Sequence, residues 1–488
     1  MTIGYDTTYD SNNGMGMDML LGSDLNFDTT LDLQKALEAG YGTDPTTQTG
    51  GGALRVESLE GSLKVLTAAT QHFMLWKIIP KTPAYSTVEE YARLNATGGD
   101  DVMGSLLEGE LPQEMTGDYS RHVTLMKFFG VTRRVSHPAT LVKTITDMKV
   151  RENENAIIDV MKILSWNLYW GNSKLGVAGA EFTEFDGLDN IVTTTLAGTG
   201  HVIDLQGQPL TDDALANGSE IIQSAYGFPN TLISGPKVLT DFAKQYYPST
   251  RTILPSNGDG KYTAGFIIDQ FVTTAGKISL VGDVYGGQKR RVCPTNATSV
   301  EAPTYAAAGT VVPSLVALGG SWNKSFGAAA GTVQYRITFC NRKGESTYTA
   351  SAAQAVIVAN QTNTVRLTIT YPASFSIAPS YIHVYRTDTI AGVGTGVYRL
   401  IKRVACSASA GGTVQVIDDT NEIMPETFNA YLGENTQRCL EFKRLLDIMR
   451  MDLAVLSPSY RWMVLLYGAL QFVAPKWWVK YINIGDAA

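Results

Sequence analysis

The sequence predicts an α+β protein whose chain is interrupted by an all-β insertion. A helical pattern runs from Ala139 to Trp170, and strands at regular spacing fill residues 302–427 without a convincing helix. Mixed helix and strand patterns lie on both sides of that segment. At 488 residues the chain is too long for one small core. We therefore expect one host domain that an insertion splits, rather than two domains in series.

The composition is that of an ordinary globular protein. Hydrophobic residues make up 44% and charged residues 17%, and the net charge of −7 argues against a broad surface that grips nucleic acid phosphates. The net charge does not exclude a protein shell that encloses nucleic acid. No apolar run of about 18 residues predicts a membrane span, and no basic segment precedes an apolar one as a secretion signal would require. The four cysteines lack C-x-x-C spacing, so we expect buried, reduced thiols.

Residues 1–75 are predicted to form an N-terminal arm with short helices. The first residues are polar, acidic and rich in glycine, which is typical of an extended arm that is ordered by a partner. Thr30 can cap a first helix, and a second helix begins near Ser58. The glycines at 50–52 predict a hinge between them, because no Lys-Ser/Thr pair follows in the spacing of a phosphate loop.

Residues 76–137 are predicted to form an extended hairpin together with strands of the host. Two strand patterns flank a polar, glycine-dotted tip. A two-stranded hairpin of this kind has too little core to be stable alone, so we expect it to lie on a neighbouring subunit. Four acids at the tip could bind a cation or pair with basic residues of a neighbour, and we favour a solvated or intersubunit tip. They are Asp100, Asp101, Glu108 and Glu110.

Residues 138–180 contain the longest predicted helix. Ser136 and Pro138 are suited to its start, and Gly171 to its end. At about 1.5 Å per residue, this single helix would be roughly 45–50 Å long. Such a length suits a spine that crosses a flat subunit.

Residues 181–301 and 428–488 complete the host. Thr211 can cap a helix whose first turn is acidic, and residues 230–246 predict a short strand followed by a helix. Two further strands precede the insertion. After it, the apolar run Trp462–Val473 predicts a buried strand, a proline breaks the run, and "WWVKYINI" predicts a final strand.

The insertion at residues 302–427 shows the clearest strand patterns. In Val333–Ser346, apolar and polar residues alternate before a turn marked by Asn341 and Gly344. Strands at this spacing over about 100 residues are typical of an immunoglobulin-like or fibronectin-like sandwich. The predicted strands are "VQYRITFCN", "AVIVA", "TVRLTITY", "YIHVYRT", "VYRLIKRV" and "TVQVIDDT".

No residue emerges as catalytic, cofactor-binding or metal-binding, so we expect no cofactor and no enzyme activity. The five histidines are scattered, and no G-x-S-x-G motif is present. Asn257–Tyr262 lacks the acids of a calcium loop, and Gly392–Gly396 lies between two predicted strands, where a hairpin loop is expected.

The order of these parts resembles the major capsid proteins of tailed bacteriophages, which share the Hong Kong phage fold. In that family an N-terminal arm precedes an extended loop, a spine helix crosses a peripheral domain, and an axial domain follows. The matching stretches are "YSTVEEYARL" with "VTLMKFFGVTRRV", Ala139–Trp170, "VIDLQGQPLTDDAL" with "LISGPKVLTDFAKQY", and the C-terminal "LLYGALQFVAPKWW".

The resemblance implies a structural protein that assembles as hexamers and pentamers into an icosahedral head around double-stranded DNA, without sequence-specific binding. It further implies scaffold, portal and decoration proteins as partners, no membrane partner, and assembly in the cytoplasm of a host bacterium. It is compatible with contacts of the insertion to host-surface glycans. Alternatives are an encapsulin-like nanocompartment shell protein and, further away, a secreted adhesin with an immunoglobulin-like domain, which would need an export signal.

Two departures from the family pattern matter. Family members often begin with a long scaffold segment that a protease removes, whereas the arm here is short, so we expect a separate scaffold or little N-terminal cleavage. Some members join subunits by an isopeptide bond from a lysine of the extended loop. Between Thr82 and Met126 this sequence has no lysine, and arginine stays protonated, so we expect noncovalent contacts between subunits.

Overall fold

The computed structural model describes residues 72–486, except for short gaps. The gaps are residues 99–104, 112–113, 143–146, 247–252, 255–262, 265–267, 287–288, 323–324, 326–330, 352–354, 358–361, 391–392 and 456. The N-terminal arm, the helices predicted at Thr30 and Ser58, the glycine hinge and Asn257–Tyr262 therefore lie outside the described residues.

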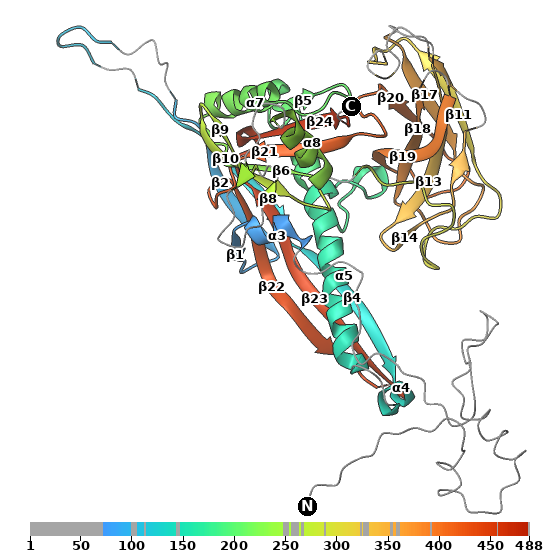
Figure 1. Cartoon of the computed structure of the whole chain (residues 1–488). Coiled ribbons are helices and arrows are strands. Elements are labelled where there is room, and N and C mark those ends of the chain that lie inside the picture. Colours follow the sequence, from blue (N-terminus) through green and yellow to red (C-terminus); the bar gives the residue numbers. More distant parts are fainter. Residues whose placement is uncertain are drawn as a thin grey trace, which may run out of the picture. The chain divides into compact units, whose positions relative to one another are not determined.

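One sheet of the host packs against its longest helix. Helix α5 (Met148–Trp170) lies along this four-stranded sheet (Figure 1). Leu164 and Leu168 of the helix and Trp462 and Leu466 of the sheet are fully buried in one core. The strands, in sheet order, are β1 (Lys81–Pro83), β22 (Leu440–Asp452), β23 (Ser459–Phe472) and β4 (Lys127–Ser136).

The prediction of one unbroken spine helix is wrong. A short helix α4 (His137–Leu141) ends at Val142, whose backbone is extended. Helix α5 begins after Asp147, whose side chain accepts a bond from the backbone N–H of Lys149 at 2.8 Å. The capping bond at Asp147 favours the start of a new helix there, after the extended backbone at Val142. The 23 residues of α5 span about 35 Å, at about 1.5 Å per residue.

A second sheet of the host has six strands and carries helices α7 (Asp212–Ser224) and α8 (Pro236–Tyr246). The predicted cap of α7 is confirmed, because the Thr211 hydroxyl accepts a bond from the backbone of Ala214. The strands, in sheet order, are β5 (Val202–Asp204), β24 (Trp478–Ile484), β21 (Phe428–Gly433), β6 (Thr231–Ser234), β10 (Gly276–Gly282) and β9 (Gln270–Thr273).

The predicted hairpin is present as strands β2 (Val88–Ala96) and β3 (Asp118–Leu125). They pair antiparallel with each other as a separate two-stranded sheet, which projects from the rest of the described fold (Figure 1). Neither strand contains a fully buried side chain. The hairpin therefore has no core of its own.

Residues 302–427, the segment predicted to be an insertion and called the insertion below, contain two principal sheets that share one core. Val311, Leu367 and Ile417 come from one sheet and Tyr335, Phe339 and Val384 from the other, and all are buried in the same cluster. The first sheet is β11 (Thr310–Val316), β17 (Thr364–Thr370) and β20 (Val414–Asp419). The second is β14 (Gly344–Glu345), β13 (Tyr335–Asn341), β18 (Tyr381–Ile390) and β19 (Val393–Ala405), with β15 (Thr349–Ala350) also paired to β13.

Strand β11 is absent from the strands predicted from the sequence. Pro313 interrupts its apolar pattern, and proline is confined to edge strands because it cannot donate a ladder hydrogen bond. Strand β11 is at the edge of its sheet, where Pro313 lies opposite Leu367. The remaining pair of short strands is β12 (Gly331–Val333) with β16 (Ala355–Ile357). In the part of the chain that the structure describes, no helix is long and apolar enough to cross a membrane.

Candidate assembly surface and buried polar clusters

The β2–β3 hairpin and the described part of its tip expose several large apolar side chains. Tyr119 is 72% exposed and Leu111, at the tip, is 90% exposed. Contiguous apolar side chains on a projecting segment mark a surface that another protein covers. The other exposed apolar residues of the hairpin and tip are Val88, Leu94, Leu106, Leu107, Met115, Val123 and Leu125. We call these residues, with Tyr119 and Leu111, the hairpin surface.

Polar contacts join the root of the hairpin, which we define as Tyr91 and Arg93 of β2, to the host. The Tyr91 hydroxyl donates to the carbonyl of Phe472 at 3.1 Å, and Arg93 donates to the carbonyl of Val473 at 3.3 Å. The Tyr91 ring stacks on His122 with centroids 5.5 Å apart. Burial raises the pKa of Tyr91, so its hydroxyl stays a donor at neutral pH. The root fixes the direction of the hairpin, whereas no hydrogen bond joins the described tip residues, 105–111 and 114–117, to the host.

The described acids of the hairpin tip are exposed. Glu110 accepts a bond from the backbone of Leu107 at 3.0 Å, within its own loop, and Glu108 lies beside it. Asp100 and Asp101 lie outside the described residues. The structure therefore brings no described pair of tip acids together around a cation.

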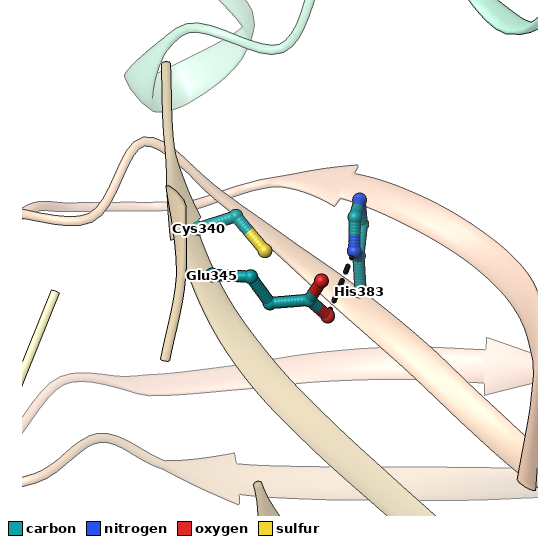
Figure 2. Close-up of side chains that lie close together, drawn as sticks. All are labelled: Cys340, Glu345 and His383. Carbon is teal, nitrogen blue, oxygen red and sulfur yellow. Dashed lines mark hydrogen bonds and ion pairs between the residues drawn. The ribbon is translucent and has the colours of Figure 1, made fainter. Parts of the chain in front are cut away.

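A buried cluster in the insertion gathers three residues that can ligate metals. Cys340 on β13, Glu345 on β14 and His383 on β18 place one ligand atom each within 4.8 Å of one another (Figure 2). Other partners already occupy the carboxylate. One oxygen of Glu345 accepts from Thr338, Tyr385 and His383, and the other pairs with Arg291 at 2.7 Å. These donors complete a hydrogen-bond network, and the adjacent guanidinium opposes a metal cation.

The electrostatics of this cluster favour an ionised Glu345. Burial alone would raise the pKa of Glu345, but the bond from His383 and the charge of Arg291 outweigh it and lower that pKa to about 2. Burial lowers the pKa of His383, so the imidazole is neutral near pH 7 and Arg291 supplies the positive charge. The cluster joins strands β13, β14 and β18 to the segment that precedes the insertion.

The insertion is attached to the host by more than its two connections. Arg403 of β19 pairs with Glu184 at 2.8 Å and donates to the carbonyl of Trp170 at 2.7 Å. The backbone N–H of Ala178 donates to the carbonyl of Cys406 at 2.7 Å. A cavity of about 340 Å³ lies at this junction. Its lining includes Trp166, Trp170, Asp189, Arg290, Leu400 and Arg403.

A second polar cluster lies beside that cavity, in the host. One oxygen of Asp189 accepts from the Lys480 amine, the Asn429 amide nitrogen and the Tyr431 hydroxyl, each at 3.2 Å. Arg290 donates to the amide oxygen of Asn429 at 3.3 Å. Burial alone would raise the pKa of Asp189, yet the charges of Lys480 and Arg290 leave that pKa below its usual value.

The prediction of buried, reduced cysteines is confirmed. Cys293, Cys340, Cys406 and Cys439 are all buried and unpaired. Burial raises the pKa of each thiol, to about 12 for Cys293 and Cys439 and about 11 for Cys406. Because the thiolate is the reactive form, these cysteines are chemically inert at neutral pH.

Sequence reasoning singled out none of the residues in the two polar clusters as a site. It treated Cys340 and His383 as scattered, and the fold brings them together. Along the chain, Asn429 lies 240 residues after Asp189, and Lys480 lies 291 residues after it. The only local signal was a lysine inside the apolar run "WWVKYINI", where a charged residue needs a buried partner.

Sequence comparison places this chain near proteins named as phage major capsid proteins. It is 30% identical over 462 residues to one from Enterococcus phage phiEF24C, and the match covers 93% of this chain and 95% of that protein. It is 27% identical over 455 residues to one from Staphylococcus phage K, again with 93% and 95% coverage. No protein-family model matches the chain.

Among solved structures, the similarity is more distant. The capsid of a native GTA particle has a TM-score of 0.45 at 7% identity, covering 91% of this chain and all (100%) of that one. The SrpI encapsulin of Synechococcus elongatus PCC 7942 has a TM-score of 0.41 at 8% identity, covering 88% of this chain and 93% of that one. These structural similarities are too distant to support an argument about function, which rests on the sequence relatives instead.

Proposed function

Because the chain belongs to the family of phage major capsid proteins, we propose that copies of it form the icosahedral head of a tailed phage, as hexamers and pentamers. The observation that carries this function is the 30% identity to a relative over 93% of the chain. The match extends over nearly the whole length of both proteins, so it does not rest on one shared module.

The β2–β3 hairpin supplies the assembly mechanism in this proposal. It projects from its own subunit, exposes apolar side chains on both strands, and has no buried residue in either strand. On a neighbouring subunit, the hairpin surface would lose contact with water, at about 25 cal/mol for each Å² of apolar area. Each subunit of a closed shell both gives and receives such contacts, so weak contacts sum to a stable shell.

We also propose that residues 302–427 form an immunoglobulin-like or fibronectin-like domain. Two antiparallel sheets that share one core support this assignment. The domain would lie on the outside of the shell, because inside it would take up volume and face the negative charge of packed DNA. There it could contact host-surface glycans or buttress neighbouring capsomers. The division into 1–75, 76–137, 138–180, 181–301, 302–427 and 428–488 belongs to the same proposal.

The remaining partners follow from the role of a head protein. The shell would enclose double-stranded DNA without reading its sequence, which agrees with a net charge of −7. Scaffold, portal and decoration proteins would assist it in the cytoplasm of the host bacterium, and the mature protein would reside in the virion. An encapsulin-like compartment is the weaker reading, because the full-length sequence relatives are phage proteins.

Electron microscopy of the purified chain tests this function. Closed shells tens of nanometres across, or capsomers that close when a scaffold protein is added, are the expected result. A chain that stays monomeric at high concentration with and without scaffold would contradict it. Particles purified from infected cells should contain double-stranded DNA, whereas a protein cargo without DNA would favour the encapsulin reading.

A further inference from the structure

We propose that the cavity where the host meets the insertion, called the junction cavity below, binds a small organic anion in which a flat ring carries a phosphate or carboxylate group. The proposal concerns a ligand site and does not depend on shell assembly. The cavity has a volume of about 340 Å³, which is within the range of small-molecule sites. Helix α5, residues 289–291 and strand β19 contribute to its lining, so a ligand there contacts both the host and the insertion.

A buried guanidinium at this cavity has more donors than partners. Arg290 is 8% exposed, and its side chain makes one hydrogen bond to a described residue, the amide oxygen of Asn429 at 3.3 Å. Its Nε is buried and has no hydrogen-bond partner among the described residues. Buried polar groups are normally hydrogen-bonded. Because a phosphate or carboxylate accepts parallel bonds from the guanidinium fork, an anion in the cavity can accept from the donors that Arg290 does not use.

The cavity lining has more positive than negative charge. Its described residues include five cations and one acid. The acid, Asp189, pairs with Lys480 at 3.2 Å. For Arg290 and Lys402, no ion pair with a described residue is present, and the Lys402 amine donates to a backbone carbonyl. The other three cations already pair with carboxylates of the chain, namely Lys289 with Glu426, Arg291 with Glu345 and Arg403 with Glu184.

The chain does not fully compensate the burial of Arg290. Burial lowers the pKa of Arg290, and the nearby charge of Asp189 opposes this effect without cancelling it. The Asp189 carboxylate instead accepts bonds from a lysine, an amide and a hydroxyl of the host. No hydrogen bond between described atoms joins that carboxylate to the guanidinium. An anion bonded to Arg290 would stabilise its buried charge, which is an electrostatic reason for this site to bind one.

Two tryptophans give the cavity a flat apolar wall. Trp166 and Trp170 are four residues apart on α5, and their ring centroids are 6.1 Å apart with an angle of 34° between the planes. Both side chains are only partly buried, so ring surface remains available to a ligand. The Arg290 guanidinium lies over the Trp170 ring at 5.2 Å. A flat ring can therefore stack on the tryptophans while its anionic group reaches Arg290, which a bare inorganic anion cannot do.

Binding at this place would strengthen the attachment of the insertion. The ligand contacts α5 of the host and β19 of the insertion, and it adds to the contacts that Arg403 makes with Glu184 and Trp170. A ligand that binds only the folded chain raises its melting temperature. The site therefore couples ligand binding to the stability of the junction.

Isothermal titration calorimetry of the purified full chain tests the proposal with two ring-bearing anions. Adenosine monophosphate is compared with inorganic phosphate and adenosine, and phenylacetate is compared with acetate. At least one of the two ring-bearing anions should bind about tenfold more tightly than its own fragments, and the one that does so identifies the anionic group. Equal affinity for the fragments, or no binding of either ring-bearing anion, would overturn the proposal.

Matched variants show whether the binding takes place in the junction cavity. Arg290→Gln can still donate to Asn429 but loses the guanidinium, so affinity should fall about ten- to a hundredfold. Trp166→Leu removes one ring and should weaken the ring-bearing anion while leaving its anionic fragment unchanged. Arg438→Gln is the control, because Arg438 also lies over a tryptophan, Trp477 at 4.4 Å, but is not part of the cavity lining. Unchanged affinity in both Arg290→Gln and Trp166→Leu would place the binding elsewhere and refute the site.

A measurement on the parent chain covers the case in which Arg290→Gln does not fold. Hydrogen–deuterium exchange is followed with and without a saturating concentration of the ring-bearing anion that binds. Peptides that contain residues 289–291 and 400–403 should exchange more slowly with the ligand, because both segments line the cavity. Unchanged exchange in both peptides at saturation would contradict the proposal.

Discussion

The β2–β3 hairpin and the insertion both extend from the same host, but only the insertion has a core. In the insertion, Trp322 is fully buried, Arg386 lies over its ring at 4.7 Å, and Asp419 pairs with Arg386 at 2.7 Å. In the hairpin strands no side chain is fully buried. A two-stranded hairpin is marginal in water, whereas two sheets over a shared core are not.

This difference indicates where each segment obtains its stability. The insertion is stabilised by contacts within itself, and its attachment to the host adds to them. The hairpin depends on its root and on whatever covers its exposed apolar side chains. In a capsid protein, the segment without a core is therefore the one expected to bind neighbouring subunits. The segment with a core can be folded without making contacts between subunits.

The largest expected effect comes from removing the hairpin. Deletion of Glu90–Gly117 should leave folded subunits or small capsomers, because none of the described residues in that range belongs to the host core. Closed shells should be absent by electron microscopy. Normal shells from the deleted chain would show that the hairpin does not hold subunits together.

Excising the insertion tests the other half of the comparison. A fragment covering Ala302–Thr427 should fold alone as a β-rich monomer with a cooperative thermal melt, since its core cluster is internal. Circular dichroism and analytical ultracentrifugation check this. A fragment that melts without cooperativity would mean that the insertion also depends on the host.

The lowered pKa of Glu345 predicts that the free energy of unfolding of the chain depends on pH. Its pKa is about 2 in the folded chain against an ordinary 4.5, so its contribution, at most about 3 kcal/mol, is complete above pH 4.5 and is lost as the pH falls towards 2. Glu345→Gln should therefore destabilise the full chain at pH 7.

The difference in unfolding free energy between the parent chain and Glu345→Gln should shrink as the pH falls from 4.5 to 2. Denaturant titrations of both chains across this range measure it. A difference that stays constant with pH would show that Glu345 acts through packing and not through its charge.

The smallest expected effect comes from changing one exposed valine in each of the two regions. Val123 in the hairpin and Val414 in the insertion are 54% and 57% exposed, so each can be changed to serine at a cost of about 0.5 kcal/mol or less to subunit stability. Val123→Ser should raise the concentration at which shells form, because it makes a neighbour contact polar. Val414→Ser should leave that concentration unchanged, and equal effects in light-scattering assays would remove the distinction between the two surfaces.

Local signals made much of the fold predictable. Thr211 and Gly235–Pro236 mark helix starts that the structure contains, and the predicted run Trp462–Val473 lies in strand β23 except for its last residue. The spine helix was predicted too long, because helical periodicity continued past the extended backbone at Val142 and the cap at Asp147. A periodic pattern shows which face of a helix would be buried, but it does not reveal a break in the backbone such as the one at Val142.

The polar clusters could not be predicted in the same way. Asp189 meets Lys480 across 291 residues, and Glu345 meets His383 across 38. No spacing rule links such partners, because strand order, not sequence distance, brings them together. A lysine in an apolar strand indicates that a partner exists, but only the fold identifies it.

Cryo-electron microscopy of assembled particles tests the central claim most directly. We predict that Tyr119, Val123 and the rest of the hairpin surface are buried against a neighbouring subunit, while residues 302–427 lie on the outer face of the shell. A shell in which the hairpin is solvated in every subunit, and the insertion instead makes the contacts between subunits, would contradict it.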